Sequence, residues 1–470
     1  MMTFERLIDG IKKNPDRAAV LFLVLFSCFF IFRGLGSSAL IDWDESIYAA
    51  VSKEILENGD WLTLRWNKEV WFEKPPLYFW LTALTYSILG ITEFAARLWS
   101  AVLGVVGVIT IYFFGKEMFG RLVGFTSAMI LASTAHWLLQ SRNGTLDIMT
   151  ASFITLTLYF FWRARENPRL WKFTGLFLGL TFMTKNAVAA IPLLVMGIFA
   201  ALEIWWERSF EKYPWRGVLL FTIYYLLITV PWHLAMYLTH GRAFIDEYFF
   251  YHILSRTKGI EGHVKPWFWY FVVFQHWARY WYLAFLGAIY LLAGLLVRDG
   301  IKKHLRGFFL FLWFFVTFLV FSVSQSKIEW YLVPIYPAAA LLIGSFVPRR
   351  KVLALLLTVF CLITVWRSSY LWKPGDYSRD VASAAKVMRE VSDLDDELWV
   401  ANLAPGPPIF YSGRKVKTIG FWGLVKKAED GGRVFVLSPG ELLENLRNDG
   451  VAAGIEVFAQ RGGVMLYGRK

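Results

Sequence analysis

Long apolar runs alternate with short polar segments along most of the chain. Most runs are about 17–25 residues long, which is enough for an α-helix to cross the hydrocarbon core of a bilayer. The pattern therefore predicts a polytopic α-helical membrane protein with about eleven transmembrane helices. The expected spans lie near 18–36, 98–115, 122–141, 147–163, 173–184, 187–205, 217–238, 279–297, 307–323, 331–347 and 352–371.

Lysine and arginine cluster in the polar segments between these runs. Cytoplasmic loops of membrane proteins carry an excess of both residues, so we assign the clusters to the cytoplasm. The N-terminus then lies inside and the C-terminus outside. The clusters lie near 6–17, 116–121, 163–172, 208–216, 298–306 and 349–351.

A further apolar stretch, PPLYFWLTALTYSILG at 75–90, would invert every later cluster if it crossed the membrane. It is short for a full crossing, and Pro75-Pro76 suits the start of a helix. We therefore expect an interfacial helix at the outer surface, within a first outer loop that spans residues 37–97.

The composition agrees with a membrane protein, because 57% of the 470 residues are hydrophobic and 18% are aromatic. A net charge of +13 also suits a nucleic-acid binder. Here the basic residues fall between the spans, so topology accounts for them. We expect membrane lipids as partners and no nucleic acid.

The last hundred residues change character. Short strand-like segments, ELWVANL, VKTIGFW, RVFVLS and GVMLYG, surround a helical ELLENLRND. This pattern is typical of a small α/β domain. We therefore expect a transmembrane domain at 1–372 and a periplasmic α/β domain at 373–470.

Acidic residues gather in the first outer loop. The segment IDWDESIYAA at 41–50 places Asp44 and Glu45 directly after an apolar run. One interpretation is structural, because a lone acidic pair often caps a helix or is solvated. The other is catalytic, and it depends on what else reaches the same membrane face.

Other charged residues are expected on that face. In FEKPPL the double proline fixes the backbone beside Lys74, which suits contact with a headgroup or phosphate. Asp147 is an acid at the outer mouth of two helices. His252, Arg256 and Lys327 lie in later outer segments. Cations opposite carboxylates suit a reaction in which a lipid-linked phosphate leaves and an acid takes a proton.

The chain resembles bacterial GT-C glycosyltransferases of the aminoarabinose transferase and protein mannosyltransferase superfamily. The pattern of that superfamily has a DE..YA element, a GDW followed by an asparagine, an EKPP element and a later RL. This chain matches with Asp44-Glu45 before Tyr48-Ala49, Gly59-Asp60-Trp61 before Asn67, Glu73-Lys74-Pro75-Pro76, and Arg97-Leu98. The likeness continues through RNGTLD, MTKNAVA, EYFFYHILSR and SKIEWYLVPIYPA, to about residue 345.

The resemblance implies roles for single residues. It makes Asp44 the candidate catalytic base and Asp147 the second essential acid. We expect Glu45 or Asp147 to assist Asp44. Lys74 and Arg256 match cations near the donor phosphate, and we add Lys327 as a further candidate. The chain departs from the pattern at Lys185-Asn186, where the superfamily commonly has Lys-Gly.

The resemblance further implies a membrane enzyme that uses a polyprenyl (undecaprenyl) phosphate sugar and lipid A or a related lipid acceptor. Its site would face the periplasm of the bacterial inner membrane. Alternatives are a protein O-mannosyltransferase, a transporter and a membrane-anchored binding protein; the charges cluster in outer loops, which argues against a transporter. No cofactor is certain. Glu73 and His252 suit a divalent cation in type, but two ligands without defined spacing are a weak candidate.

Overall fold

The computed structural model describes residues 14–255, 263–347, 351–367, 376–429, 433–448 and 454–469. The chain forms two compact units. Unit 1 comprises Met1–Arg33, Phe72–Leu77 and Trp99–Tyr370. Unit 2 comprises Gly34–Trp71, Tyr78–Leu98 and Leu371–Lys470.

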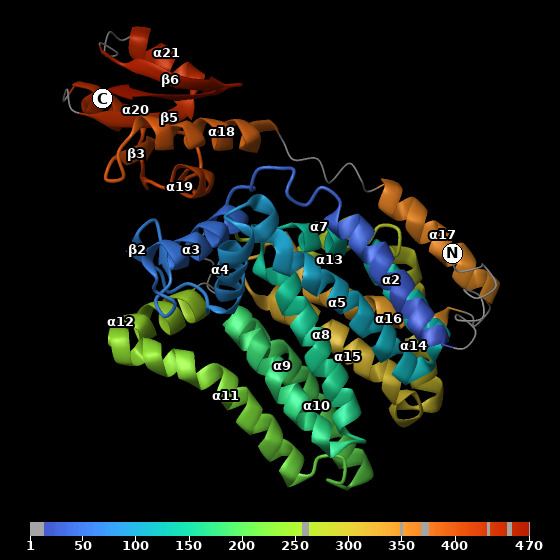
Figure 1. The fold of residues 1–470 in the computed structure, drawn as a ribbon. Coiled ribbons are helices and arrows are strands. Elements are labelled where there is room, and N and C mark those ends of the chain that lie inside the picture. Colours follow the sequence, from blue (N-terminus) through green and yellow to red (C-terminus); the bar gives the residue numbers. More distant parts are fainter. Residues whose placement is uncertain are drawn as a thin grey trace, which may run out of the picture. The chain divides into compact units, whose positions relative to one another are not determined.

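Unit 1 is built of helices (Figure 1). Its α-helices are α2 (Pro15–Phe32), most of α5 (Glu93–Phe119), α6 (Arg121–Ser133), α7 (Ala135–Arg142), α8 (Leu146–Ala164), α9 (Trp171–Thr184), α10 (Ala190–Glu207), α11 (Trp215–His240), α12 (Arg242–Ile245), α13 (Trp269–Trp277), α14 (Tyr282–Asp299), α15 (Leu305–Val323), α16 (Tyr336–Phe346) and α17 (Lys351–Arg367). Short 3₁₀ segments are η1 (Pro168–Leu170), η2 (Asn186–Ala189), η5 (Ile301–His304) and η6 (Glu329–Ile335), and η3 (Asp246–Ser255) is a π-helix.

Over the residues that the structure describes, each span expected from the sequence overlaps helix in unit 1. Among the described residues, six helical segments are long and apolar enough to cross a membrane: α2, α5, η2 with α10, α11, α14, and η5 with α15. The bent pair α6 and α7 would make a seventh. The expected interfacial stretch forms α4 (Leu77–Leu89), a short apolar helix.

The span expected at 122–141 is broken between α6 and α7, which meet at 63°. Thr134 adopts extended backbone at the break. Its hydroxyl donates to the Ile130 carbonyl at 2.8 Å, and the Ser133 hydroxyl donates to the same carbonyl at 3.1 Å. Such back-bonding by Ser and Thr offers the backbone an alternative partner and bends helices.

Glycines bring helices of unit 1 into close contact. A Cβ on Gly175 of α9 would lie 2.1 Å from the carbonyl oxygen of Phe221 in α11, and one on Gly179 would lie 2.9 Å from Ile228 Cβ. Helices α9 and α11 accordingly lie side by side (Figure 1). Small residues serve this purpose in membrane helix packing, where close backbone approach increases van der Waals contact.

Unit 2 combines segments from both ends of the chain. Its N-terminal part holds α3 (Asp44–Asn58), the short hairpin of β1 (Arg65–Trp66) and β2 (Glu69–Val70), and most of α4. Its C-terminal part holds α18 (Asp376–Val391), β3 (Glu397–Val400), α19 (Gly406–Ser412), β4 (Lys415–Thr418), α20 (Phe421–Glu429), β5 (Val434–Pro439), α21 (Gly440–Asn448), β6 (Glu456–Arg461) and β7 (Val464–Arg469).

The C-terminal strands form one mixed sheet in the order β4-β3-β5-β7-β6. Strands β4, β3 and β5 are parallel, whereas β5, β7 and β6 are antiparallel. Four strands and helix α21 lie at the segments expected from the sequence, and β6 is additional.

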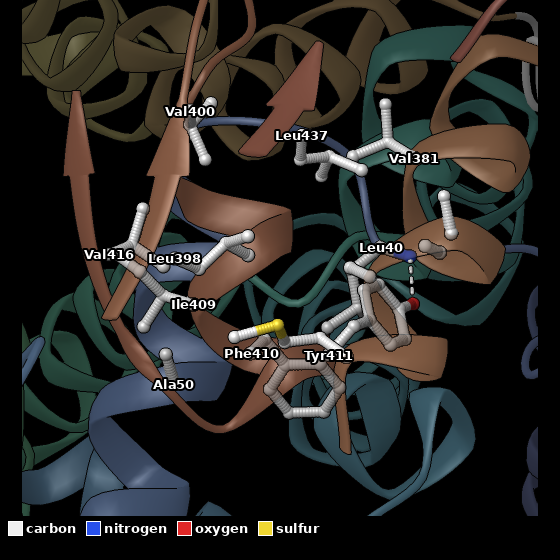
Figure 2. Packing of buried hydrophobic residues seen from close by; sticks show 14 of the residues in the cluster. Leu40, Ala50, Val381, Leu398, Val400, Ile409, Phe410, Tyr411, Val416 and Leu437 are labelled. Atoms are coloured by element: carbon white, nitrogen blue, oxygen red, sulfur yellow. Dashed lines mark hydrogen bonds between the residues drawn. The ribbon is translucent and has the colours of Figure 1, made fainter. Parts of the chain in front are cut away.

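One hydrophobic core joins the two parts of unit 2 (Figure 2). Leu40 and Ala50 of the N-terminal part pack in the same cluster as Phe410 and Tyr411 of α19 and Leu398 of β3. The Leu40 N–H also donates to the Tyr411 hydroxyl at 2.8 Å. The first outer loop and the C-terminal segment therefore share a core.

Candidate active site

Helix α3 begins at Asp44, directly after a strained residue. Trp43 is the N-cap residue, with φ 64° and ψ −131°, and no side chain caps the helix. Asp44 is partly exposed in the first helical turn. Asp44 is thus the first residue of the helix and not its N-cap residue, and a carboxylate at this position interacts favourably with the helix N-terminus.

Glu45 is held in a buried ion pair with Arg97. The Arg97 Nε donates to Glu45 Oε1 at 2.7 Å, and its Nη2 donates to Oε2 at 2.9 Å. The two side chains are 2% and 3% exposed. Oε2 also accepts the Ile41 N–H at 2.6 Å. Both carboxylate oxygens are thus engaged in fixing the loop before α3, which favours a positioning role over proton transfer.

Arg97 also binds backbone carbonyls of the segment that precedes α3. Its Nη1 donates to the carbonyls of Leu35 and Ser38 at 2.8 and 3.0 Å, and its Nη2 donates to that of Ala39 at 3.0 Å. Charge-assisted bonds of this kind are stronger than neutral ones. The RL element of the sequence pattern therefore has a clear structural function.

Asp147 of unit 1 forms an ion pair with Lys185. Asp147 lies in the first turn of α8, and Lys185 follows the last residue of α9. The ammonium lies 2.8 Å from Asp147 Oδ1, and the side chains of Asp147 and Lys185 are 5% and 14% exposed. The Lys185 ammonium also lies 4.1 Å from the centre of the Tyr331 ring. The pair is well shielded from water. Charge interactions are stronger in such a shielded position than in bulk water.

Lys185 is a residue that sequence reasoning did not select. Arg142, five positions before Asp147, instead donates its guanidinium to the carbonyls of Phe30, Ile31 and Arg33. The signal for Lys185 was its position in the MTKNAVA element. Nothing local in the chain indicates that it meets Asp147, because 38 positions separate them.

Lys74 and Glu73 form a second pair in unit 1. The Lys74 ammonium lies 2.7 Å from Glu73 Oε1, and the side chains of Lys74 and Glu73 are 11% and 21% exposed. Phe72, the preceding residue, packs edge-on against the rings of His240 and Phe244. These aromatic contacts and the double proline hold Lys74 in a defined position.

Two further polar groups lie near this pair. Burial raises the pKa of Glu247, and the negative charge of Glu73 raises it further. His252 Nε2 lies 3.8 Å from Glu247 Oε1. Across the described residues, no group of three or more His, Cys, Asp or Glu side chains is placed to hold a metal ion.

The remaining two candidates are Lys327 and Arg256. Lys327 is buried after α15, where its ammonium donates to the Ser324 carbonyl and its N–H donates to the His263 carbonyl at 3.0 Å. Burial lowers the pKa of Lys327. Arg256 lies outside the described residues. In unit 1 the structure therefore pairs Asp147 with Lys185 and Lys74 with Glu73. In unit 2 it pairs Glu45, the residue next to Asp44, with Arg97.

Known proteins resemble this chain in both sequence and fold. The family described as dolichyl-phosphate-mannose-protein mannosyltransferase matches residues 73–234. An undecaprenyl phosphate-alpha-4-amino-4-deoxy-L-arabinose arabinosyl transferase of Proteus mirabilis is 30% identical over 351 residues, which cover 70% of this chain and 60% of that protein. The crystal structure of ArnT from Cupriavidus metallidurans bound to undecaprenyl phosphate superposes with a TM-score of 0.79 at 18% identity, over 96% of this chain and 97% of that one.

The chain is thus similar in sequence to aminoarabinose transferases and protein mannosyltransferases, and it shares their GT-C fold. A more distant member of the same fold, the oligosaccharyltransferase of Archaeoglobus fulgidus, superposes with a TM-score of 0.58 at 12% identity, over 93% of this chain and 71% of that one. These likenesses confirm the polytopic helical GT-C fold expected from the sequence.

Proposed function

We propose that this GT-C protein transfers a sugar from a polyprenyl phosphate to lipid A or a related lipid acceptor at the periplasmic face of the inner membrane. The observation that carries the proposal is the 30% identity over 351 residues to a transferase whose name specifies an undecaprenyl phosphate aminoarabinose donor. The chain spans 60% of that relative's length, so donor and acceptor are both part of the proposal.

Cationic side chains would bind the donor phosphate. The bond between the sugar and the phosphate breaks, and the polyprenyl phosphate leaves with the electron pair. Lys74 is fixed beside Glu73 and the double proline, so it needs little reorganisation to stabilise that developing charge. Arg256 and Lys327 are proposed as further phosphate contacts, in accordance with the resemblance and with their place in the sequence.

Acidic side chains would act at the acceptor. With a hydroxyl acceptor, Asp44 takes its proton while the acceptor oxygen bonds to the sugar. With a phosphate acceptor, which is already ionised, Asp44 and Asp147 orient the sugar or the cations instead. Lys185 holds Asp147 in position, and Glu45 acts by holding the start of α3 through Arg97.

The proposed membrane arrangement keeps about eleven spans, with α4 at the outer interface. The catalytic part is residues 1–372, and the α/β segment at 373–470 is periplasmic. The positive-inside rule supports this orientation, because the basic clusters then share the cytoplasmic side.

An alternative acceptor is a Ser or Thr hydroxyl of an exported protein. The match to the protein mannosyltransferase family over residues 73–234 supports this alternative acceptor. Mass spectrometry of lipid A and of secreted proteins from cells with and without the gene separates the two. Loss of a sugar from lipid A supports the proposal, whereas loss from proteins alone supports O-mannosylation.

A direct assay tests the reaction itself. Purified protein in liposomes is given a polyprenyl-phosphate sugar and lipid A, and the mass of lipid A is followed. Gain of one sugar residue, absent with Lys74→Ala, is the expected result. Equal product from wild type and Lys74→Ala would remove this lysine from donor recognition.

A further inference from the structure

A pocket of about 550 Å³ lies at one end of unit 1, where several helices terminate. It is bordered by the last residue of α5, the end of α8, η5, the start of α15 and the end of α16. This end carries basic clusters that the positive-inside rule assigns to the cytoplasm. The candidate active-site residues do not line it.

Two of the lining cations are available for an anion. Lys302 is exposed and donates to the Trp206 carbonyl at 3.0 Å, and Arg306 donates to the Met118 carbonyl. These carbonyls lie in the last turns of α10 and α5, where cations interact favourably with the helix dipole. Among the described residues, neither cation pairs with a carboxylate, and both retain further N–H donors.

The neighbouring cations already lie beside carboxylates. Lys212 lies 2.9 Å from Glu203 and 2.7 Å from Glu207. Lys303 and His304 lie 3.8 and 2.9 Å from the carboxylate of Asp299. Lys302 and Arg306 are therefore the lining cations that have no carboxylate partner among the described residues, and Glu166 is the one acidic residue in the lining.

The pocket also has an apolar wall. Phe119, Trp162, Leu292, Leu295 and Phe346 line it. Helix α14, which supplies two of these residues, continues this apolar surface with Leu291, 50% exposed. A soluble phosphate would gain nothing from such a wall, whereas a lipid presents an apolar glycerol and acyl region directly beside its phosphate.

We propose that this pocket binds the headgroup of an anionic phospholipid, with Lys302 and Arg306 on the phosphate and the apolar wall against the start of the acyl chains. Basic pockets between membrane helices on the cytoplasmic side suit such headgroups. The site is separate from sugar transfer, and the inference depends on the proposed orientation of the chain. The bound lipid bridges the ends of α10, α14 and α15 and so stabilises unit 1.

The test is native mass spectrometry of the full chain in a neutral detergent, mixed with equal amounts of phosphatidylglycerol and phosphatidylcholine. Wild type is expected to retain phosphatidylglycerol preferentially. In Lys302→Gln/Arg306→Gln that retention should fall at least about ten-fold, because two charges near the lipid surface are lost. Glutamine can still donate to the two helix-end carbonyls, so folding should survive. If the double variant is unstable, Lys302→Gln alone provides the test, because Lys302 is exposed.

The matched control is Arg169→Gln/Arg216→Gln, which removes two exposed charges from the same end without touching the pocket. It should keep phosphatidylglycerol within about two-fold of wild type. Equal loss in both double variants would overturn the pocket as the site, because overall charge would then explain binding. Unchanged retention in Lys302→Gln/Arg306→Gln would overturn it directly. Inorganic phosphate that displaces the lipid at equal concentration would show a site for soluble anions instead.

Discussion

Asn67 and Val416 exchange two hydrogen bonds across 349 positions of the chain. The Asn67 side chain donates to the Val416 carbonyl at 2.8 Å and accepts the Val416 N–H at 2.8 Å. Val416 lies in β4, an edge strand of the C-terminal sheet, so the Asn67 amide replaces a missing neighbouring strand at this residue. Asn67 has φ 57°, which asparagine tolerates better than most residues. The asparagine of the sequence pattern thus ties the first outer loop to the C-terminal sheet.

Asn67→Asp tests this contact. Aspartate tolerates the same backbone conformation but cannot donate to the Val416 carbonyl. We expect unit 2 to lose about 1–3 kcal/mol of stability, because a buried carbonyl loses its donor. Hydrogen exchange at 65–70 and 415–418 should become faster. Asn448→Asp, an exposed change of the same charge in the same unit, is the control. Equal exchange in both variants would mean that the amide contributes nothing.

Glu45→Gln should lower the stability of the fold. It leaves the buried Arg97 guanidinium without a countercharge, which costs about 3–5 kcal/mol, so thermal unfolding should begin at a lower temperature. Glu69→Gln in the same unit is the control, because its side chain is 71% exposed and its pair with Lys415 is a surface contact. Unchanged unfolding with lost turnover would instead make Glu45 a direct participant in the reaction.

The helices were largely predictable because their signal is local. A run of apolar residues long enough to cross a bilayer satisfies its backbone as helix whatever it packs against. The break at Thr134 was not predicted, because serine and threonine lie in many intact membrane helices. Strand β6 was also missed, since most of its side chains are exposed and EVFAQR lacks a clear alternation.

The candidate site was predictable only residue by residue. Sequence patterns indicated Glu45 and Asp147, but the partners of both residues come from distant segments. Glu45 meets Arg97 across 52 positions, and Asp147 meets Lys185 across 38. Such pairs depend on how helices pack, which periodicity does not encode.

Topology is tested by fusions. A reporter after Lys470 should behave as periplasmic, and one at Glu207, the last residue of α10, should behave as cytoplasmic. The reason is the cluster of positive charge that follows Glu207, at 208–216. Periplasmic behaviour at Glu207 together with cytoplasmic behaviour after Lys470 would mean that α4 crosses the membrane and that the outer loops are wrongly assigned.

Asp44→Asn tests the acid at the start of α3. Asparagine is nearly isosteric, and loss of the charge from the first turn should cost no more than about 1 kcal/mol. Turnover of the polyprenyl-phosphate sugar should nevertheless fall by at least about 10²-fold, because asparagine accepts no proton at neutral pH. The product is read by mass beside a thermal unfolding curve. Wild-type turnover would leave Asp44 a structural residue.

Asp147 and Lys185 should behave as one unit. Asp147→Asn leaves a shielded ammonium without its countercharge, and Lys185→Met leaves the carboxylate alone, so each should lower both thermal stability and turnover. The double variant Asp147→Asn/Lys185→Met removes both charges. It should unfold at a higher temperature than either single variant and turn over no more slowly, because residues that act together are not additive.

The pair of Asp16 and Lys116 supplies the control. Its atoms lie 2.7 Å apart, but its side chains are 30% and 32% exposed, so its loss should cost little. Asp16→Asn/Lys116→Met should therefore keep wild-type turnover. Additive losses in the Asp147 and Lys185 variants would show two independent contributions. Full turnover in Asp147→Asn would restrict the pair to holding α8 against α9, and Asp44 would remain as the candidate acid.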